Sequence, residues 1–406
     1  MDEKIRQNLI KACRASQEET DKILQDLIRI RSYSGEEEEI VRYIQGRMNE
    51  FGFAEVFIDG LGNIVGRIGE GPLNILWDAH VDTVQVTEGE SWQFPPFEGV
   101  IQEGIIYGRG AVDEKPAMAG FLSAGKILAA NFSQNDLPFT LYVVGSVLEE
   151  DCDGYPLRHL IEVEGIKPDL VLLGEPTDLQ VYRGQRGRME IQVSARGKAA
   201  HGAHNQQGIN AIYRMMPLVK ALEELDNSLN PVSPLGKGAI TVSQIISQGP
   251  SLCSVPDFCR IHIDRRLTGG EDKHVALEQL KGLLHEMNLE AEIHIPEYQG
   301  TSWKGTRFSQ EAYFPTWILE EDHMLVQAGQ RTVEAVMRQP RKTGFWNFST
   351  NGVATAGRLG IPTIGFAPGK EELAHTAREE LDLKDLQLAT RFYALFPFIL
   401  AESDRK

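Results

Sequence analysis

Four apolar runs along the chain each lead into acidic or histidine residues. The runs cover residues 73–77, 140–148, 170–173 and 362–367, and they precede His80, Glu149-Glu150, Glu175 and His375, in that order. Continuous apolar runs of this length are typical of strands in a parallel sheet that is covered on both faces. Ligand sites of open α/β sheets lie beyond the carboxyl ends of the strands, so we expect the four ends to bring these side chains together.

The segments before and between these runs alternate between helical and strand patterns. Residues 17–31 have helical periodicity, and Ser34 followed by Glu37 predicts a capping box for a second helix that ends near Gly52. Apolar residues on both sides of a glycine-rich turn predict a hairpin over residues 55–68 at the edge of the sheet.

The pattern changes after Asp178, where apolar and polar residues begin to alternate, as in a half-exposed antiparallel strand. The predicted order is strand 191–195, helix 210–225, strands 239–246 and 258–264, helix 271–287 and strand 290–295. This order is that of the ferredoxin-like motif. From about Thr301 the pattern of helices and buried strands resumes.

These patterns predict an α/β protein with two domains, as the length of 406 residues also favours. A catalytic domain of residues 1–182 and 299–406 has a mostly parallel mixed sheet flanked by helices. It is interrupted by a ferredoxin-like α+β domain, residues 183–298.

Composition indicates which kinds of binding partner and which cellular compartment to expect. With 41 basic and 58 acidic residues the net charge is −17, which disfavours nucleic acid and anionic membranes as partners. The first residues lack a signal-peptide pattern, and no apolar stretch is long enough to span a membrane, so we expect a soluble cytoplasmic protein. The chain's 4 cysteines show no metal-finger spacing and are expected to be reduced thiols.

The residues at the strand ends favour a metal site. His80 suits a metal ligand because Asp82, two residues on, could fix its tautomer through the other ring nitrogen. Glu149 and Glu150 are adjacent and face different ways, so one could bind metal while the other stays free as a base. Taken singly, each of these features also fits an ordinary solvated strand end or charged loop. A further acid, Asp113, follows a Gly-Arg-Gly loop.

In combination, the segments resemble a known family. They are Gly108-Arg-Gly-Ala-Val-Asp113-Glu-Lys, the strand-end His80, the pair Glu149-Glu150, Gly-Glu175-Pro-Thr and Ala-His375-Thr. Together they resemble the zinc metallohydrolases that include acetylornithine deacetylase, succinyl-diaminopimelate desuccinylase, aminoacylase and glutamate carboxypeptidase. Nearly the whole chain is covered, in order, and within this family it most resembles the YgeY-type branch, which is described as linked to selenium metabolism.

The resemblance implies two zinc ions, with cobalt or manganese as possible substitutes, and a role for each residue. Asp113 would bridge the ions, His80 and Glu175 would complete one site, and Glu150 and His375 the other. Glu149 would be the base that deprotonates the bridging water, and Asp82 would orient His80. The family also has a cis peptide after the bridging acid, here Asp113-Glu114.

Further segments resemble the family's substrate contacts. His201 matches a histidine that reaches the active site of a partner subunit in a homodimer and stabilises the oxyanion. The resemblance therefore implies that the domain of residues 183–298 serves as a lid and a dimerisation domain. Arg266 matches an arginine that grips a substrate carboxylate, whereas for Arg265 a structural ion pair is preferred. Thr350 and Asn351 lie in a segment that resembles a substrate-facing loop.

The resemblance implies a hydrolase that cleaves the amide bond of a small N-acyl amino acid, a dipeptide or a related compound. Cys253 departs from the family, since many relatives have there an asparagine that contacts the substrate carboxylate and a thiol is a poor donor. An aminopeptidase or dipeptidase that acts on a free amino terminus is an alternative, although Arg266 weighs against it. A catalytically inactive binding homologue is a second alternative.

Overall fold

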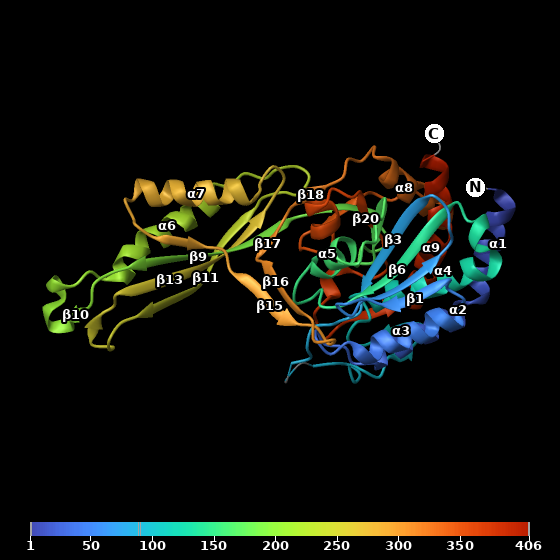
Figure 1. The fold of residues 1–406 in the computed structure, drawn as a ribbon, viewed down its shortest axis with the longest axis horizontal. Coiled ribbons are helices and arrows are strands. Elements are labelled where there is room, and N and C mark those ends of the chain that lie inside the picture. Colours follow the sequence, from blue (N-terminus) through green and yellow to red (C-terminus); the bar gives the residue numbers. More distant parts are fainter. Residues whose placement is uncertain (1, 88, 90, 405–406) are drawn as a thin grey trace.

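The computed structural model describes residues 2–87, 89 and 91–404 and shows an elongated molecule with two sheets side by side (Figure 1). The larger sheet, with its helices, carries both ends of the chain. The second sheet is built from the middle of the chain and extends away from the termini. The architecture is the mixed α/β fold predicted from the sequence.

Among the described residues, the large sheet has nine strands, and its centre is parallel. The strands are β1 (Glu55–Ile58), β2 (Ile64–Ile68), β3 (Leu73–His80), β6 (Phe139–Ser146), β7 (Leu170–Leu173), β8 (Tyr182–Gln185), β18 (Trp317–Ile318), β19 (Gly344–Trp346) and β20 (Thr363–Gly365). Their order is β1-β2-β6-β3-β7-β20-β8-β18, with β19 beside β8. The neighbours β6, β3, β7 and β20 run parallel, so the four apolar runs become four adjacent strands.

Helices cover both faces of this sheet. They are α1 (Glu3–Ala15), α2 (Gln17–Arg29), α3 (Glu38–Glu50), α4 (Lys115–Asn131), α5 (Tyr155–Glu162), α8 (Met324–Met337), α9 (Leu383–Asp404) and the short η3 (Val353–Arg358). One core lies between the sheet and α1 to α4, α8 and α9 and includes Trp77, whereas α5 and η3 pack on the other face against Leu76. Successive residues of β3 therefore face opposite cores, as a strand covered on both sides requires. None of the described helices is long and apolar enough to cross a membrane.

The predicted edge hairpin is confirmed, but the capping box is wrong. Strands β1 and β2 pair antiparallel at the edge of the sheet. Helix α3 begins at Glu38, and the side chains of the predicted box serve other partners. The hydroxyl of Ser34 donates to Asp82, and a carboxylate oxygen of Glu37 accepts from the backbone N–H of Leu148. The sequence pattern is common to a cap and to a loop that reaches a distant segment, and here the distant contacts prevail.

The second sheet has the predicted strand order. Its elements are β9 (Gly187–Arg196), α6 (Ala211–Ser228), β11 (Ala239–Gln248), β13 (Phe258–Leu267), α7 (Lys273–Glu286) and β14 (Glu292–His294). The spatial order is β11-β13-β9-β14, with β17 (Tyr313–Phe314) also on β9, and the short β10 (Ala200–His201) and β12 (Ser254–Val255) pair separately. Helices α6 and α7 bury a core of their own against this sheet. We call residues 187–294 the inserted region.

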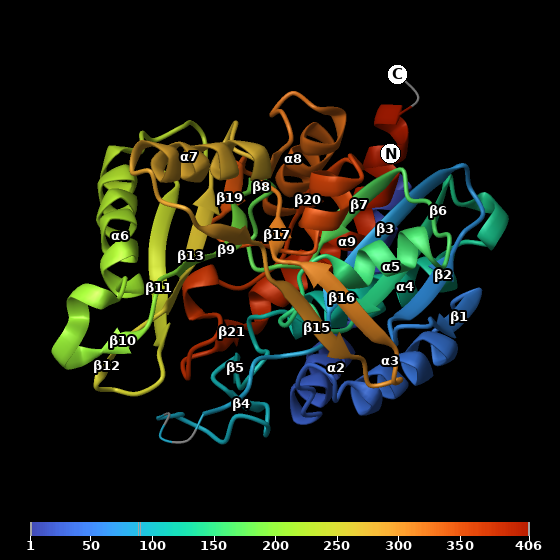
Figure 2. The same cartoon turned by 60° about the vertical axis from the view of Figure 1, so that its left-hand side comes forward.

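Besides the pair of β10 and β12, the described residues form two smaller sheets that were not predicted. Strands β15 (Glu297–Thr301) and β16 (Arg307–Glu311) form a hairpin that lies between the inserted region and the large sheet (Figure 2). Its strands are only partly buried and too short for a clear periodic signal. Strands β4 (Val100–Gln102), β5 (Ile105–Tyr107) and β21 (Glu380–Asp382) form the other, in the order β21-β5-β4. This sheet joins the segment before Asp113 to the segment after His375.

Candidate metal centre

The carboxyl ends of the four parallel strands meet at one edge of the large sheet. His80 is the last residue of β3, and Glu149, Glu175 and His375 lie in the loops that follow β6, β7 and β20. Because the strands are adjacent and parallel, these loops emerge at the same edge. Asp113 reaches this edge from the loop between β5 and α4, and its peptide bond to Glu114 is cis, as predicted.

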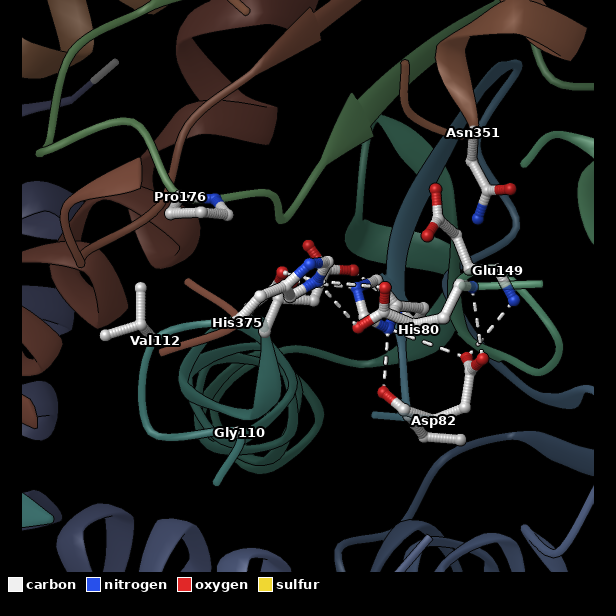
Figure 3. Close-up of polar contacts among 12 residues, drawn as sticks. His80, Asp82, Gly110, Val112, Glu149, Pro176, Asn351 and His375 are labelled. Carbon is white, nitrogen blue, oxygen red and sulfur yellow. Dashed lines mark hydrogen bonds and ion pairs between the residues drawn. The ribbon is translucent and has the colours of Figure 1, made fainter. Parts of the chain in front are cut away.

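Asp113 stands between His80 and His375, the two histidines labelled in Figure 3. Its Oδ1 lies 2.9 Å from Nε2 of His80, and its Oδ2 lies 3.1 Å from Nε2 of His375. Nε2 of His375 also lies 3.0 Å from a carboxylate oxygen of Glu150. A carboxylate whose two oxygens face two different groups of ligands has the geometry of a bridging residue.

Two overlapping groups of possible ligand atoms surround His80. One combines His80 with Glu149 and Glu175, the other combines it with Asp113 and Glu150, and in each group the atoms lie within 4.8 Å of one another. His80, Asp113, Glu149 and Glu175 are all buried. His375 differs, because its side chain is 49% exposed and its φ of 61° lies in the left-handed region.

The turn that carries Glu149 and Glu150 is held by Asp82. One carboxylate oxygen of Asp82 accepts from the backbone N–H of Glu149 at 3.2 Å, and the other accepts from that of Glu150 at 3.1 Å and from the hydroxyl of Ser34 at 2.7 Å. Glu150 lies beside His375, whereas Glu149 groups with Glu175. The two adjacent acids therefore have different surroundings, as their adjacency predicted.

The other ring nitrogen of His80 has its closest contact with a backbone carbonyl. Nδ1 lies 2.9 Å from the carbonyl oxygen of Asp82 and 3.5 Å from its carboxylate. A carbonyl oxygen accepts only, so Nδ1 donates to it, and Nε2 is the ring nitrogen that faces Asp113. Asp82 thus orients His80 mainly through its main chain.

Burial and close neighbours shift the pKa values of the ionisable groups in the cluster. Burial, and then the neighbouring carboxylates, raise the pKa of Glu149 and of Glu175 well above the ordinary value. Burial acts against Asp113 too, yet hydrogen bonds from His375 and His80 hold its pKa below the usual range. The same contacts with Asp113 and with Glu150 raise the pKa of His375 to about 10. Four carboxylates are thus crowded around two histidines.

The residues fit a pair of divalent ions. Nitrogen and carboxylate oxygen ligands without thiolate suit zinc, cobalt or manganese. Oε1 of Glu149 is buried and has no hydrogen-bond partner within the described structure, and such an atom is costly unless a cation or a water meets it. The donor set and this orphaned oxygen support the predicted metal site.

A cavity of about 840 Å³ opens beside the cluster. Its lining is mostly polar and includes Asp153, Arg188, Arg266, Phe348, Ser349, Lys370 and Glu371. Arg188 and Arg266 are register partners on β9 and β13, so two arginines stand side by side on the wall that the inserted region supplies. Arg265, by contrast, makes a buried ion pair with Glu271, as expected of a structural residue.

Thr350 and Asn351 lie behind the wall of the cavity. Both are buried, and neither lines it, whereas the preceding Phe348 and Ser349 do. The amide of Asn351 donates to Asp78 and to Ser146, and its oxygen accepts from the N–H of Gly154. In this structure the two residues support the cavity wall rather than face the cavity.

His201 lies far from the cluster of its own chain. It is exposed at the outer tip of the inserted region, on β10, where it pairs with Ser254 of β12 (Figure 1). Its Nδ1 accepts from the N–H of Ala203 at 3.1 Å, which leaves Nε2 available. His201 does not line the cavity.

Sequence reasoning did not find several residues around the site. Arg188 and Asp153 line the cavity, and they form an ion pair at 3.8 Å. Arg188 could have been found from the predicted antiparallel pairing, because it stands opposite Arg266. The buried pair of Arg109 and Glu379 joins segments 270 positions apart, and no local pattern marks it.

The sequence is similar to those of known metalloenzymes. The model of peptidase family M20/M25/M40 matches residues 76–397. Protein YgeY of Escherichia coli (strain K12) is 42% identical over 381 residues, which cover 94% of this chain and 94% of YgeY. Acetylornithine deacetylase of Pectobacterium carotovorum is 27% identical over 351 residues, which cover 85% of this chain and 82% of the deacetylase.

The fold is similar to that of a solved metalloenzyme. The Bacillus subtilis YxeP protein, described as a dinuclear metal-binding peptidase of family M20, superimposes with a TM-score of 0.69. The match covers 96% of this chain and 99% of YxeP, at 14% identity. This similarity shows that the fold is shared over nearly the full length of both chains.

Proposed function

The chain belongs to peptidase family M20/M25/M40, a family of metal-dependent hydrolases, and from this premise we propose that its own site cleaves a small polar amide with two zinc ions. The family acts on N-acyl amino acids and dipeptides and depends on dinuclear metal. Amide hydrolysis is therefore the reaction class. The residue roles, the choice of zinc and the dimer are parts of the proposal.

The arrangement around Asp113 carries the proposal. His80 and His375 face opposite oxygens of one carboxylate, and Glu150 joins His375. We assign Asp113 as the bridging ligand, His80 and Glu175 to one ion, and Glu150 and His375 to the other. Two divalent ions held there would polarise the scissile carbonyl and make a water molecule more acidic.

Glu149 is proposed as the general base. It lines the cavity, it is buried, and one of its carboxylate oxygens has no protein partner among the described residues. With the proposed ions bound to offset the neighbouring carboxylates, it would take a proton from the attacking water and pass it to the leaving nitrogen. Asp82 keeps this base in place, because its carboxylate accepts from the backbone N–H of Glu149.

The cavity lining supports a small polar substrate. Arg266 reaches the cavity from β13 and suits a carboxylate. The wall has few apolar groups, chiefly Phe348 and Tyr182, so it offers little surface that would bind a long apolar acyl chain. An N-acyl amino acid of modest size satisfies both observations.

A dipeptidase is the second candidate. Asp178, Glu371 and Glu372 also line the cavity and could bind a free amino group. A dipeptide has both an ammonium and a carboxylate, so it would use the acidic and the basic walls together. Comparing matched N-acetyl amino acids and dipeptides as substrates separates the two candidates.

The domain of residues 183–298, which contains the inserted region, is proposed as a lid and dimerisation domain. Strand β11 is the edge of its sheet, and the exposed apolar side chains of Tyr213, Met216 and Ile245 lie on α6 and β11. An open edge beside an apolar patch is suited to pairing with a second copy. His201 would then stabilise the oxyanion in the partner's site.

We also propose a reducing, cytoplasmic setting. All four cysteines are free thiols, and Cys13, Cys152 and Cys259 are buried. Disulfides are rare in reduced compartments, so free thiols fit that location.

The proposal is tested by loading the metal-free protein with zinc and assaying a panel of N-acetyl amino acids. Hydrolysis that requires zinc and that fails in Glu149→Gln is expected. Zinc-independent hydrolysis, or full activity in Glu149→Gln, would contradict the mechanism.

A further inference from the structure

We propose that Glu379 is a positioning residue that holds the loops of Asp113 and His375 at a fixed separation, and that it thereby sets the affinity of the metal position that these two residues share. The inference rests on the proposed function, because that position is assigned there. Glu379 itself does not line the cavity and contacts no reacting group.

Both carboxylate oxygens of Glu379 contact the loop that leads to Asp113. Its Oε2 accepts from the backbone N–H of Gly110 at 2.9 Å and of Val112 at 3.2 Å. Its Oε1 pairs with the guanidinium of Arg109. The side chains of this ion pair are 0% and 1% exposed, so water does not compete for these contacts.

The main chain strengthens the same link. The carbonyl oxygen of Glu379 accepts from the N–H of Gly108 at 3.2 Å, and the next residue, Glu380, pairs with Tyr107 where β21 meets β5. Glu379 therefore joins the start of β21 to the end of β5 through both side chain and main chain. Asp113 follows β5, and His375 lies four positions before Glu379.

The opposite end of the Asp113 loop has a separate anchor. Nζ of the buried Lys115 donates to the carbonyl oxygens of Leu27 and Ile30, each at 2.9 Å. The loop is thus fixed after Asp113 to the last turn of α2 and the residue that follows this helix, and before Asp113 to Glu379. Of these two attachments, the one to Glu379 also involves the segment that carries His375.

His375 needs such an anchor more than the other proposed ligands do. Its side chain is 49% exposed, whereas that of His80 is 1% exposed. Its left-handed backbone, with φ of 61°, is unfavourable for a residue with a side chain and is retained only when the surroundings impose it. In the view of Figure 3, Gly110, Val112 and His375 fall on one side of the site, and Glu149 and Asp82 on the other.

The contacts predict unequal effects on the two metal positions. The position of Asp113, Glu150 and His375 contains both segments that Glu379 joins. The position of His80, Asp113 and Glu175 contains only the Asp113 segment. Its ligand His80 is held separately, at the end of β3. Residues that orient metal ligands typically contribute roughly 10–100-fold to metal affinity, and we expect this loss at the first position.

Two double variants isolate the hydrogen-bond acceptor from the ion pair. Arg109→Met with Glu379→Leu removes both charges and the acceptor. Arg109→Met with Glu379→Gln removes both charges but keeps an oxygen that can accept from Gly110 and Val112. Neither variant leaves a buried charge without a partner, which protects the fold. Unfolding midpoints of the metal-free proteins check this.

The measurement is a titration of the metal-free full-length proteins with Co²⁺, followed by absorption and by calorimetry. The Leu variant is expected to bind one ion as the wild type does and the other roughly 10–100-fold more weakly. The Gln variant should bind both nearly as the wild type does. Equal affinities in the two double variants would overturn the inference.

Adding the Arg109→Met and Glu379→Leu changes to two single variants, Glu175→Gln and Glu150→Gln, identifies which metal position is weakened. In Glu175→Gln the ion that remains occupies the position of Glu150 and His375, so adding Arg109→Met with Glu379→Leu should weaken its binding roughly 10–100-fold. In Glu150→Gln the remaining ion should survive the same addition. The reverse pattern would refute the assignment. A wild type that binds no Co²⁺ would instead refute the proposed metal site itself, so the two failures are distinguishable.

A substitute covers the case in which the Leu variant does not fold. Glu379→Asp keeps the charge but withdraws the carboxylate by one methylene group from the N–H groups of Gly110 and Val112. The same selective loss is expected. Unchanged affinity at both positions in Glu379→Asp would contradict a positioning role.

Discussion

The strand-end edge of the large sheet carries a histidine that is proposed to bind metal, and the outer tip of the inserted region carries one with a proposed catalytic role, in very different surroundings. His80 is 1% exposed, contacts Asp113 through one ring nitrogen and donates to a carbonyl through the other. His201 is exposed on the two-residue strand β10. The contacts of His80 come from its own chain, whereas the ring of His201 is accessible to a partner subunit.

The difference indicates which parts of the site are preorganised. Backbone N–H groups and buried carboxylates fix the loops around Asp113 and Glu149, so these groups need no rearrangement before they act. The position of His201 depends on how the inserted region is placed and on what covers it. Variants at the two regions should therefore fail in different ways.

The largest loss is expected from Asp113→Ala. The change removes a ligand from both proposed ions, so hydrolysis should fall below detection and excess zinc should not restore it. A terminal-ligand change such as Glu175→Gln should be partly rescued by added zinc, because it affects one ion only. Activity against zinc concentration is the measurement. Rescue of Asp113→Ala by zinc would break the bridging assignment.

Glu149→Gln should lower kcat by roughly 10²–10⁴-fold while the metal content stays that of the wild type, because the amide cannot accept the proton of water. Glu150→Gln is the matched control, since it should reduce the occupancy of one ion. Both variants are assayed for kcat and for bound metal. If Glu149→Gln emptied the site and Glu150→Gln left it full, the two roles would be exchanged.

His201→Ala should reduce kcat by roughly 10²–10³-fold, the usual effect of removing an oxyanion donor, with both metals in place. His204→Ala, three positions along, is the control and should have little effect. Mixing inactive His201→Ala with inactive Glu149→Gln should restore activity once subunits exchange. In each hybrid, one site keeps its own Glu149 and receives an intact His201.

Absence of recovery despite proven exchange would show that His201 acts within its own chain or not at all. The proposal that the tip of the inserted region completes the site of a partner subunit would then be wrong. Ultracentrifugation of the same samples establishes whether a dimer is present.

The smallest effect is expected from Arg266→Gln. An interaction with a charged group contributes about 1.5–3 kcal/mol, so KM for a carboxylate substrate should rise roughly tenfold or more while kcat changes little. A substrate analogue that bears a carboxamide in place of the carboxylate is the control and should be insensitive. Equal sensitivity of both compounds would argue against a carboxylate clamp.

The local pattern predicted the strands and the edge at which the site forms. Apolar runs before His80, Glu149 and Glu175 are strong local signals, and the rule that parallel strands share one carboxyl edge places their ends together. The antiparallel inserted region could likewise be predicted, because its strands alternate and its helices are periodic. These features depend on interactions between neighbouring positions.

The contacts that fix the loops could not be predicted in this way. Ser34 and Glu37 satisfy the pattern of a helix cap, yet their side chains reach Asp82 and Leu148 instead. Glu379 reaches a loop 269 positions away. Such contacts depend on the assembled fold, and a single sequence carries no local sign of them.

The metal content of the wild-type protein tests the central claim most directly. Elemental analysis after purification without chelators should find two divalent ions per chain, mainly zinc, and Asp113→Ala, purified in parallel, should hold far less. A wild type with almost no metal, even after dialysis against zinc, would contradict the account. So would an Asp113→Ala protein that keeps both ions.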